Sequence, residues 1–525
     1  MRVFQYDFYY FKAFIGDKGR RKIKTQSDEN QSRPQVRQSE CLTGIPTEAD
    51  IPLDAEVSLE NRPAVSAAVG ADANIDRVNL PLMHFAWPIM IENIIRVAIT
   101  SADVIMLSYY AEEAVAATGV INQLVFLINL LYLMVASGAS ILISQNLGAG
   151  NAAAAGRVAQ GSVMLLGVFS VILSAGLCIC ADPVIGFFKL DRNVHAFAME
   201  YFVIYSGGSV FVALCMILST IIRSYGHSRG PMLVNVVAMA INVCGNYLFI
   251  FRGFGDTLRG FAGINVSVIQ GVAVSTIASQ IAASAILYAM MKRHKDIALE
   301  KGGMLKVPPS VYRRILAVGV PTAGENLSYN LGQIMIMRMV ATLGTNAMAA
   351  FVYAVTVLRF VFITSISIGS AVQIKVGYYV GAMMAETAQR KVYRYFLAGA
   401  AVSTALVLAV KLLQFPIIDM FTRNPEIQAM SFGVLLVALV HEPGRNFNVI
   451  IIPALKGAGD VRYPVYVGMI FMWGVGVTLA YVLGITLGWG LIGICIAMAA
   501  DEWSRGVVIF FRWRGGRWKG KELVG

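Results

Sequence analysis

The stretch WPIMIEN at Trp87–Asn93 places a glutamate and an asparagine inside a long apolar run, just after a proline. A second stretch, VPTAGEN at Val320–Asn326, repeats the arrangement. A charged residue at the centre of a membrane-spanning helix costs about 2.5–3.5 kcal/mol, so such a carboxylate is usually there for a functional reason. The two stretches therefore indicate a repeated membrane unit that keeps its carboxylate.

The rest of the chain is as apolar as these stretches. It has 525 residues, of which 57% are hydrophobic and 14% charged, with a mean hydropathy of +0.64. Soluble proteins carry about 25% charged residues. Because lipid cannot satisfy backbone hydrogen bonds, apolar runs long enough to cross a ~30 Å bilayer core should be helices. The composition predicts an all-α integral membrane protein with twelve spans: 82–107, 115–146, 157–181, 197–222, 231–251, 264–291, 313–341, 347–380, 391–415, 427–455, 464–485 and 490–511.

The spans fall into two copies of six. Aligning Pro88 with Pro321 gives an offset of 233 residues, which holds without a gap for over 140 residues. At this offset the following residues coincide: Glu92 with Glu325, Asn93 with Asn326, Gly148 with Gly381, Arg157 with Arg390, and Gly226 with Gly459. Since six is an even number, both copies insert in the same orientation. We expect two six-helix lobes related by a pseudo-twofold axis along the membrane normal.

The domain boundaries follow from these spans. We expect a polar, disordered cytoplasmic tail at 1–78, an N-lobe at 79–291, a cytoplasmic linker at 292–312, a C-lobe at 313–512 and a basic cytoplasmic tail at 513–525. The first segment has no short apolar core followed by a small-residue cleavage site, so it does not read as a signal peptide. It is either a disordered tail or an upstream extension from a misassigned start.

The +12 formal charge is sorted between alternate loops. Basic residues gather in one set of loops, at Arg157, Arg223, Arg229, 292–314, Arg390, Lys391, Arg394, Lys456, Arg462 and the C-terminal tail. The opposite loops hold only Lys189, Arg192, Arg252, Arg259 and Arg423. The positive-inside rule then predicts an inner or plasma membrane protein with both termini cytoplasmic, and no nucleic-acid partner.

Several kinds of chemistry are not expected. The six cysteines form no CxxC pair, and the five histidines show no metal-ligand spacing. The glycine-rich segment 148–156 follows a membrane span rather than a strand, and no phosphate-binding GxxxxGK[ST] occurs. We therefore predict no metal, no cofactor and no enzymatic activity. Transport by this chain must draw on an ion gradient.

Several longer stretches resemble the multidrug and toxic compound extrusion (MATE) family, especially its bacterial members. They are TSADVIMLSYYAEEAVAATGV at 100–120, ISQNLGAGNAAAAGRV at 143–158, INVCGNYLFIF at 241–251, ENLSYNLGQIMIMRMVATLGTNAMAA at 325–350 and ALKGAGDVRYP at 454–464. The resemblance covers about residues 80–520. It implies two six-helix lobes and export of organic, often cationic compounds against entry of sodium ions or protons.

The resemblance also suggests a coupling site in the N-lobe. Asp103 matches the aspartate of the first helix that the family uses to bind a cation or proton. Asn242 and Asn246 lie four residues apart on one helix face and could add oxygens. Several relatives have aspartate at the position of Asn246. The alternative is that Asp103 only caps its helix near the outer surface.

Three further carboxylates lie deep in predicted spans. Glu92 has Arg96 four residues on, and Glu442 has Arg445 three residues on, so each has a candidate partner on its own helix. Glu325 has no basic residue within a turn. It needs a partner from another helix, such as Arg359, or it stays protonated. Asp103, Asn242, Asn246, Glu325 and Glu442 are the candidate coupling residues, with Glu92, Arg96, Arg359 and Arg445 as possible charge partners.

A sodium-driven branch of the family carries acidic residues about one turn from Glu325 and Glu442. Here Tyr329 and Arg445 stand at the matching positions, which puts a direct transfer of that C-lobe site in doubt.

The sequence thus predicts a monomeric antiporter, driven by sodium ions or protons, that exports small organic compounds of cationic or amphiphilic character. Two alternatives remain open. One is a flippase for lipid-linked oligosaccharides or another amphiphile, since Arg96, Arg359, Lys375 and Arg445 could meet anionic groups. The other is a membrane receptor or scaffold that does not transport.

Overall fold

The computed structural model describes residues 77–255, 257, 266–298 and 307–523. The tail predicted at 1–78 lies almost entirely outside this range, as do 299–306 of the predicted linker. Everything below concerns the described residues.

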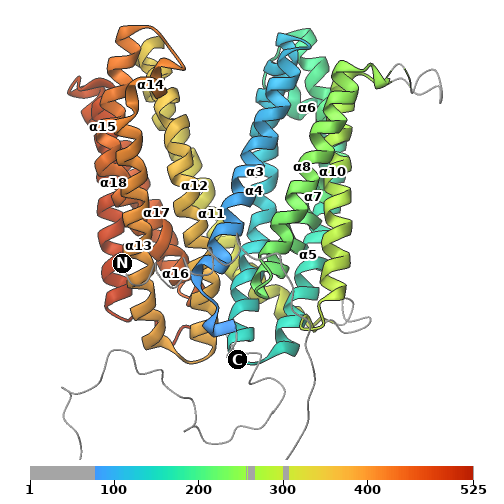
Figure 1. Ribbon diagram of the computed structural model, residues 1–525, viewed down its shortest axis with the longest axis vertical. Coiled ribbons are helices and arrows are strands. Elements are labelled where there is room, and N and C mark those ends of the chain that lie inside the picture. The colour runs from blue at the N-terminus through green and yellow to red at the C-terminus, as the bar shows by residue number, and fades with distance from the viewer. Residues whose placement is uncertain (1–76, 256, 258–265, 299–306, 524–525) are drawn as a thin grey trace, which may run out of the picture. The chain divides into compact units, whose positions relative to one another are not determined.

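The described chain folds into twelve long helical spans (Figure 1). The N-lobe holds α3 (Leu82–Ser108), α4 (Glu112–Gly148), α5 (Ala152–Ile179), α7 (Arg192–Ser224), α8 (Arg229–Phe251) and α10 (Val268–Arg293). The C-lobe holds α11 (Pro309–Thr342), α12 (Thr345–Gly381), α13 (Ala385–Leu412), α15 (Pro425–Asn446) continued by η2 (Phe447–Ile451) and α16 (Ile452–Gly457), α17 (Arg462–Phe471) continued by η3 (Met472–Val477) and η4 (Ala480–Thr486), and α18 (Gly490–Arg514). The all-α fold with twelve spans is confirmed.

Among the described residues, nine helices are long and apolar enough to cross a membrane by length and composition alone. The other three long helices are α3, α11 and α18, and each contains at least three charged side chains. These three helices therefore carry most of the residues that matter for function.

The duplication extends to details that the sequence did not predict. Two short helices, α6 (Ala181–Gly186) and α14 (Gln414–Asp419), interrupt the chain at the same 233-residue offset. Gly226 and Gly459 adopt the left-handed conformation at equivalent turns, with φ of 99° and 95°. Both turns need a residue without a Cβ, because that conformation is strained for other side chains.

The two lobes meet through equivalent residues of α4 and α12. Gly148 packs against the backbone of Tyr378, and Gly381 packs against the backbone of Gln145, so a Cβ at either glycine would overlap its neighbour. Gln145 Nε2 donates to Gly457 O at 2.8 Å, and Tyr378 Oη donates to Ser224 O at 2.6 Å. Each of these contacts maps onto the other at the 233-residue offset. The junction is therefore two-fold related in its hydrogen bonds as well as in its packing.

The chain end completes this junction. The Leu523 N–H donates to Gln145 Oε1 at 2.8 Å, and the Leu523 side chain packs with Ile141, Val318 and Val461. Buried Lys375 of α12 donates to Val78 O at 2.6 Å and to Leu80 O at 2.7 Å.

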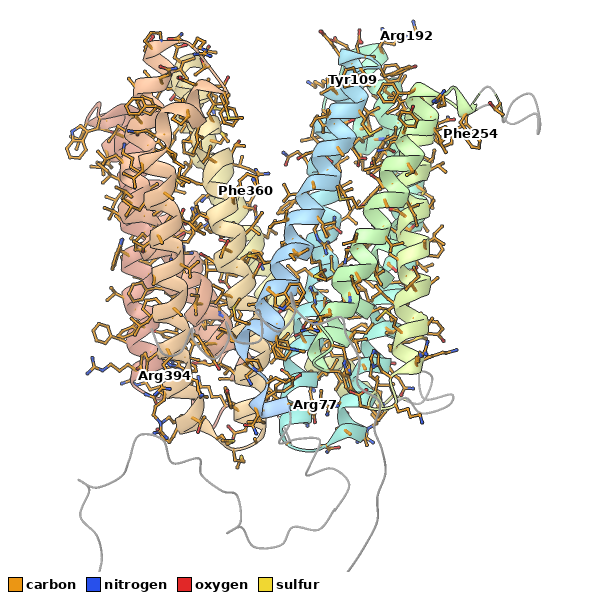
Figure 2. All side chains as sticks on the ribbon, viewed as in Figure 1. Arg77, Tyr109, Arg192, Phe254, Phe360 and Arg394 are labelled. Carbon is orange, nitrogen blue, oxygen red and sulfur yellow. The ribbon has the colours of Figure 1, made fainter. Side chains whose placement is uncertain are left out.

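The described bundle has two unlike ends (Figure 2). Arg77 and Arg394 lie at one end, whereas Tyr109, Arg192 and Phe254 lie at the other.

Candidate functional site

The residues proposed for the N-lobe come together between α3 and α8. Asp103 is 8% exposed, and Asn242 and Asn246 are fully buried. Asn246 Nδ2 donates to Asp103 Oδ1 at 2.5 Å, while Asn242 Nδ2 donates to Thr276 Oγ1 of α10 at 3.1 Å. Asp103 thus bonds to a neighbouring helix from inside α3, which continues to Ser108. This geometry does not fit the alternative of a simple helix cap.

Three amide oxygens near these helices lack a partner. Among the described residues, Oδ1 of Asn242, Asn246 and Asn129 is buried and accepts no hydrogen bond. A buried unsatisfied acceptor costs about 1–3 kcal/mol, which a positive ion at the same place would offset. Hard cations prefer carboxylate and amide oxygens. The residues present at Asp103 therefore suit a cation bound through oxygen.

The repeated glutamates both form ion pairs. Glu92 Oε2 lies 2.9 Å from Arg223 Nη1, and Glu92 Oε1 lies 3.2 Å from Arg96 Nη2, the partner expected on its own helix. Glu325 Oε2 lies 2.7 Å from Lys456 Nζ. The partner of Glu325 is therefore Lys456, and not Arg359 as the sequence suggested.

Arg223 and Lys456 are equivalent at the 233-residue offset, and both stand in the last turn of a helix. Their long side chains bring a positive charge back from the helix end to the buried carboxylate. The repeated glutamate thus belongs to a repeated ion pair, with Arg in one copy and Lys in the other.

A larger charged cluster fills the space between α15 and α18 of the C-lobe. Arg445 Nη1 lies 2.7 Å from Glu442 Oε1, as the spacing predicted. Arg445 also lies 3.8 Å from Glu502, and Arg505 bridges Glu502 at 2.8 Å and Asp501 at 3.3 Å. Arg445 and Arg505 further lie over the rings of two aromatic residues, Phe362 at 5.1 Å and Tyr329 at 5.7 Å.

Sequence reasoning missed three members of this cluster, Asp501, Glu502 and Arg505. The signal was available, because the run DEWSR stands inside the apolar span 490–511. The π-helical segment η2 begins two residues after Arg445, and its Asn448 donates to Glu502 Oε2 at 2.7 Å. Such π-helical turns often mark functional positions.

A third cluster lies outside the spans. Asp296 Oδ2 lies 2.9 Å from both Arg77 Nη2 and His227 Nε2, and the rings of His227 and His294 stack 4.0 Å apart at 19°. Burial raises the pKa of Asp296, but the hydrogen bonds and charges of His227 and Arg77 outweigh this effect and lower it to about 2. Burial and His227 lower the pKa of His294, against the opposite effect of Asp296.

Ligand atoms of His227, His294 and Asp296 lie within 4.8 Å of one another, a grouping that the sequence spacing did not predict. The two stacked rings are nearly parallel, so their lone pairs point along nearly parallel planes. One ring would have to rotate before both could bind the same ion in tetrahedral geometry. The observed arrangement is that of an ion-pair cluster.

The comparison with known families agrees with this architecture. The MatE family model matches residues 88–248 and 321–482, once in each lobe. The chain belongs to the MatE family. The two matches begin 233 residues apart, at Pro88 and Pro321, the offset of the duplicated glutamates.

Individual MATE relatives cover most of the chain. An uncharacterized transporter, YisQ of Bacillus subtilis, is 34% identical over 445 residues, covering 84% of this chain and 96% of the relative. A probable multidrug resistance protein NorM of Thermotoga maritima is 26% identical, covering 86% and 95%. A solved structure described as the outward-facing conformation of a multidrug resistance MATE transporter shares the fold, with a TM-score of 0.76 at 19% identity, covering 84% of this chain and 97% of that one.

Membership establishes the class of the protein. It is a multi-pass membrane protein of a multidrug efflux transporter family, and that family consists of transporters rather than enzymes.

Proposed function

We propose that this MATE protein is a monomeric antiporter that exports cationic or amphiphilic organic compounds by alternating access, driven by inward movement of a cation. The observation that carries the proposal is the buried oxygen cluster around Asp103, in which one carboxylate faces two asparagine side chains with unpaired oxygens. One negative charge with neutral amide oxygens matches a monovalent ion. The unpaired Asn242 and Asn246 oxygens favour sodium over a bare proton, because a proton needs only one oxygen of Asp103.

The charge distribution supports an orientation with both chain ends cytoplasmic. Arg77 and Arg394 share the end of the bundle at which the two lobes are joined by Gln145 and Tyr378. A basic end is expected on the cytoplasmic side. The lobe contacts would then close the cytoplasmic side and would have to open during each cycle.

The alternatives fit these contacts less well. Three of the four basic residues that would serve a lipid-linked anion are engaged internally: Arg96 with Glu92, Lys375 with backbone carbonyls, and Arg445 with Glu442. A flippase would need such residues for its substrate. A receptor without transport would have no reason to retain a buried carboxylate beside unpaired oxygens at Asp103.

Reconstitution into liposomes tests the proposal. The purified protein is given a fluorescent organic cation under a sodium gradient, a pH gradient or neither, with Asp103→Asn as the variant. The matched control is Asp182→Asn, which removes a carboxylate that is 83% exposed on α6. We expect sodium-driven export by the wild type and the control, and loss of gradient dependence in Asp103→Asn. Gradient-driven export by Asp103→Asn at the wild-type rate would refute the coupling role.

A further inference from the structure

The charged cluster between α15 and α18 does not balance. It contains three carboxylates, Glu442, Asp501 and Glu502, but two guanidinium groups, Arg445 and Arg505. The carboxylate residues are 1%, 3% and 4% exposed. An uncompensated charge in such a place costs several kcal/mol. One positive charge is therefore missing from the cluster.

His441 does not supply that charge. Its Nδ1 lies 3.4 Å from Glu442 Oε1, and its Nε2 lies 3.4 Å from Arg445 Nη2. Arginine can only donate, so Nε2 must be the unprotonated acceptor. The ring is then neutral and carries its proton on Nδ1, facing the carboxylate.

The unpaired atoms show where the charge is missing. Glu502 is well satisfied, since Arg505, Arg445 and Asn448 all contact it. Asp501 has one contact with a basic group, at 3.3 Å to Arg505, and its Oδ1 is buried without a hydrogen-bond partner among the described residues. Glu442 Oε2 is unpaired in the same way, although Glu442 Oε1 has a close ion pair with Arg445.

The neighbouring backbone leaves room at Asp501. Gly476 of the π-helical segment η3 faces it, and a Cβ at Gly476 would lie 3.4 Å from Asp501 Cγ. A larger residue at 476 would therefore crowd the one carboxylate of the cluster that lacks a close counter-charge.

We infer that Asp501 holds a second coupling charge in the C-lobe, either a proton or a sodium ion, in addition to the one at Asp103. This inference rests on the antiport function proposed above. It gives each lobe one site for a single positive charge, so a transport cycle carries two. The C-lobe site uses α18 and is partly neutralised by arginine, in contrast to the amide-lined N-lobe site.

Binding stoichiometry tests this inference without depending on transport. Detergent-purified wild type, Asp103→Asn, Asp501→Asn, the double variant and the Asp182→Asn control are titrated in two arms. One arm adds sodium at pH 8 and follows heat, and the other counts protons taken up on acidification in sodium-free buffer. Summed over the arms, Asp501→Asn should bind one charge fewer than wild type, and the double variant two fewer. Equal numbers for Asp501→Asn and wild type would overturn the inference.

Stability gives a second readout. Asp501→Asn balances the cluster, so it should fold and, in sodium-free buffer at pH 8, melt at or above the wild-type temperature. Glu502→Gln removes a carboxylate held by both arginines and should melt lower. Misfolding or a lower melting temperature of Asp501→Asn would mean that the cluster needs its third negative charge, against the inference. Efflux separates the two proposals: absence of ion-driven efflux in the wild type refutes the antiport function, whereas wild-type efflux with an unchanged ion-to-substrate ratio in Asp501→Asn refutes only the second site.

Discussion

Lys456 Nζ lies 2.7 Å from Glu325 Oε2, in the position that Arg223 occupies beside Glu92 in the other lobe. The Lys456 and Glu325 side chains are 8% and 14% exposed, so each leaves the other's charge nearly buried if it is removed. Breaking a buried pair by removing one partner costs about 3–5 kcal/mol.

Glu325→Gln should therefore destabilise the protein by about 3 kcal/mol through the stranded Lys456. The double variant Glu325→Gln with Lys456→Gln should recover at least half of that loss. Thermal unfolding of the purified variants in detergent measures both. If the double variant is no more stable than the single one, Glu325 has a role other than pairing with Lys456.

The N-lobe site offers a gain of function. Asn246→Asp adds a second carboxylate beside Asp103, as in several relatives of this family, and should bind sodium at least threefold more tightly because the site gains a negative charge. Asn246→Ser removes the amide oxygen and should weaken binding. Sodium titration at pH 8, where a shared proton would be lost most easily, is the measurement. A lower affinity in Asn246→Asp would indicate that the two carboxylates share a proton instead.

The lobe junction can be weakened by one atom. Tyr378→Phe removes the hydrogen bond to Ser224 O and keeps the ring, so it should favour separation of the lobes at this end by about 0.5–1.5 kcal/mol, or roughly two- to tenfold. Spin labels at Ala149 and Met383, both exposed, would report the change as a larger population of long distances in a cysteine-free background.

Tyr379→Phe is the matched control, because its hydroxyl lies 3.3 Å from Tyr395 within the same lobe. A shift of the distance distribution in Tyr379→Phe equal to that in Tyr378→Phe would show that the junction is insensitive to the Ser224 bond.

The cluster outside the spans predicts a dependence on pH. Since burial and His227 lower the pKa of His294, the folded protein favours the neutral ring while the unfolded chain protonates near 6.5. Stability should fall as the pH drops below about 6.5. His294→Gln should reduce this fall between pH 8 and 5.5 in thermal unfolding, whereas His195→Gln on α7 should not. Asp296, with its pKa of about 2, remains charged throughout this range and adds no slope until the pH falls below about 4.

The sequence predicted the spans closely, because lipid allows few solutions for an apolar run and because the duplication checks each span against a second copy. The span expected at 231–251, for example, is α8 at Arg229–Phe251. Asp103, Asn242 and Asn246 were also found, since their spacing places the asparagines on one face and the family resemblance names the aspartate.

Partners from distant helices were harder to predict. Lys456 lies 131 residues from Glu325, and no periodicity connects them. The contact of Arg223 with Glu92 would have implied it at the 233-residue offset, but that contact spans 131 residues as well. The cluster of α18 was missed for another reason: the span was judged by its mean hydropathy, which hides a charged run of five residues.

The Leu523–Gln145 hydrogen bond also has a consequence for biosynthesis. These residues are separated by 378 positions, and Gln145 and Gly457 by 312. At about 5–20 residues per second, the ribosome needs roughly 20–75 s to proceed from Gln145 to Leu523. During that time the N-lobe is in the membrane with the side chain of Gln145 still lacking both of its partners. The first lobe is thus completed by the last residues made, and a chain released early would keep an exposed polar seam that cellular quality control can recognise.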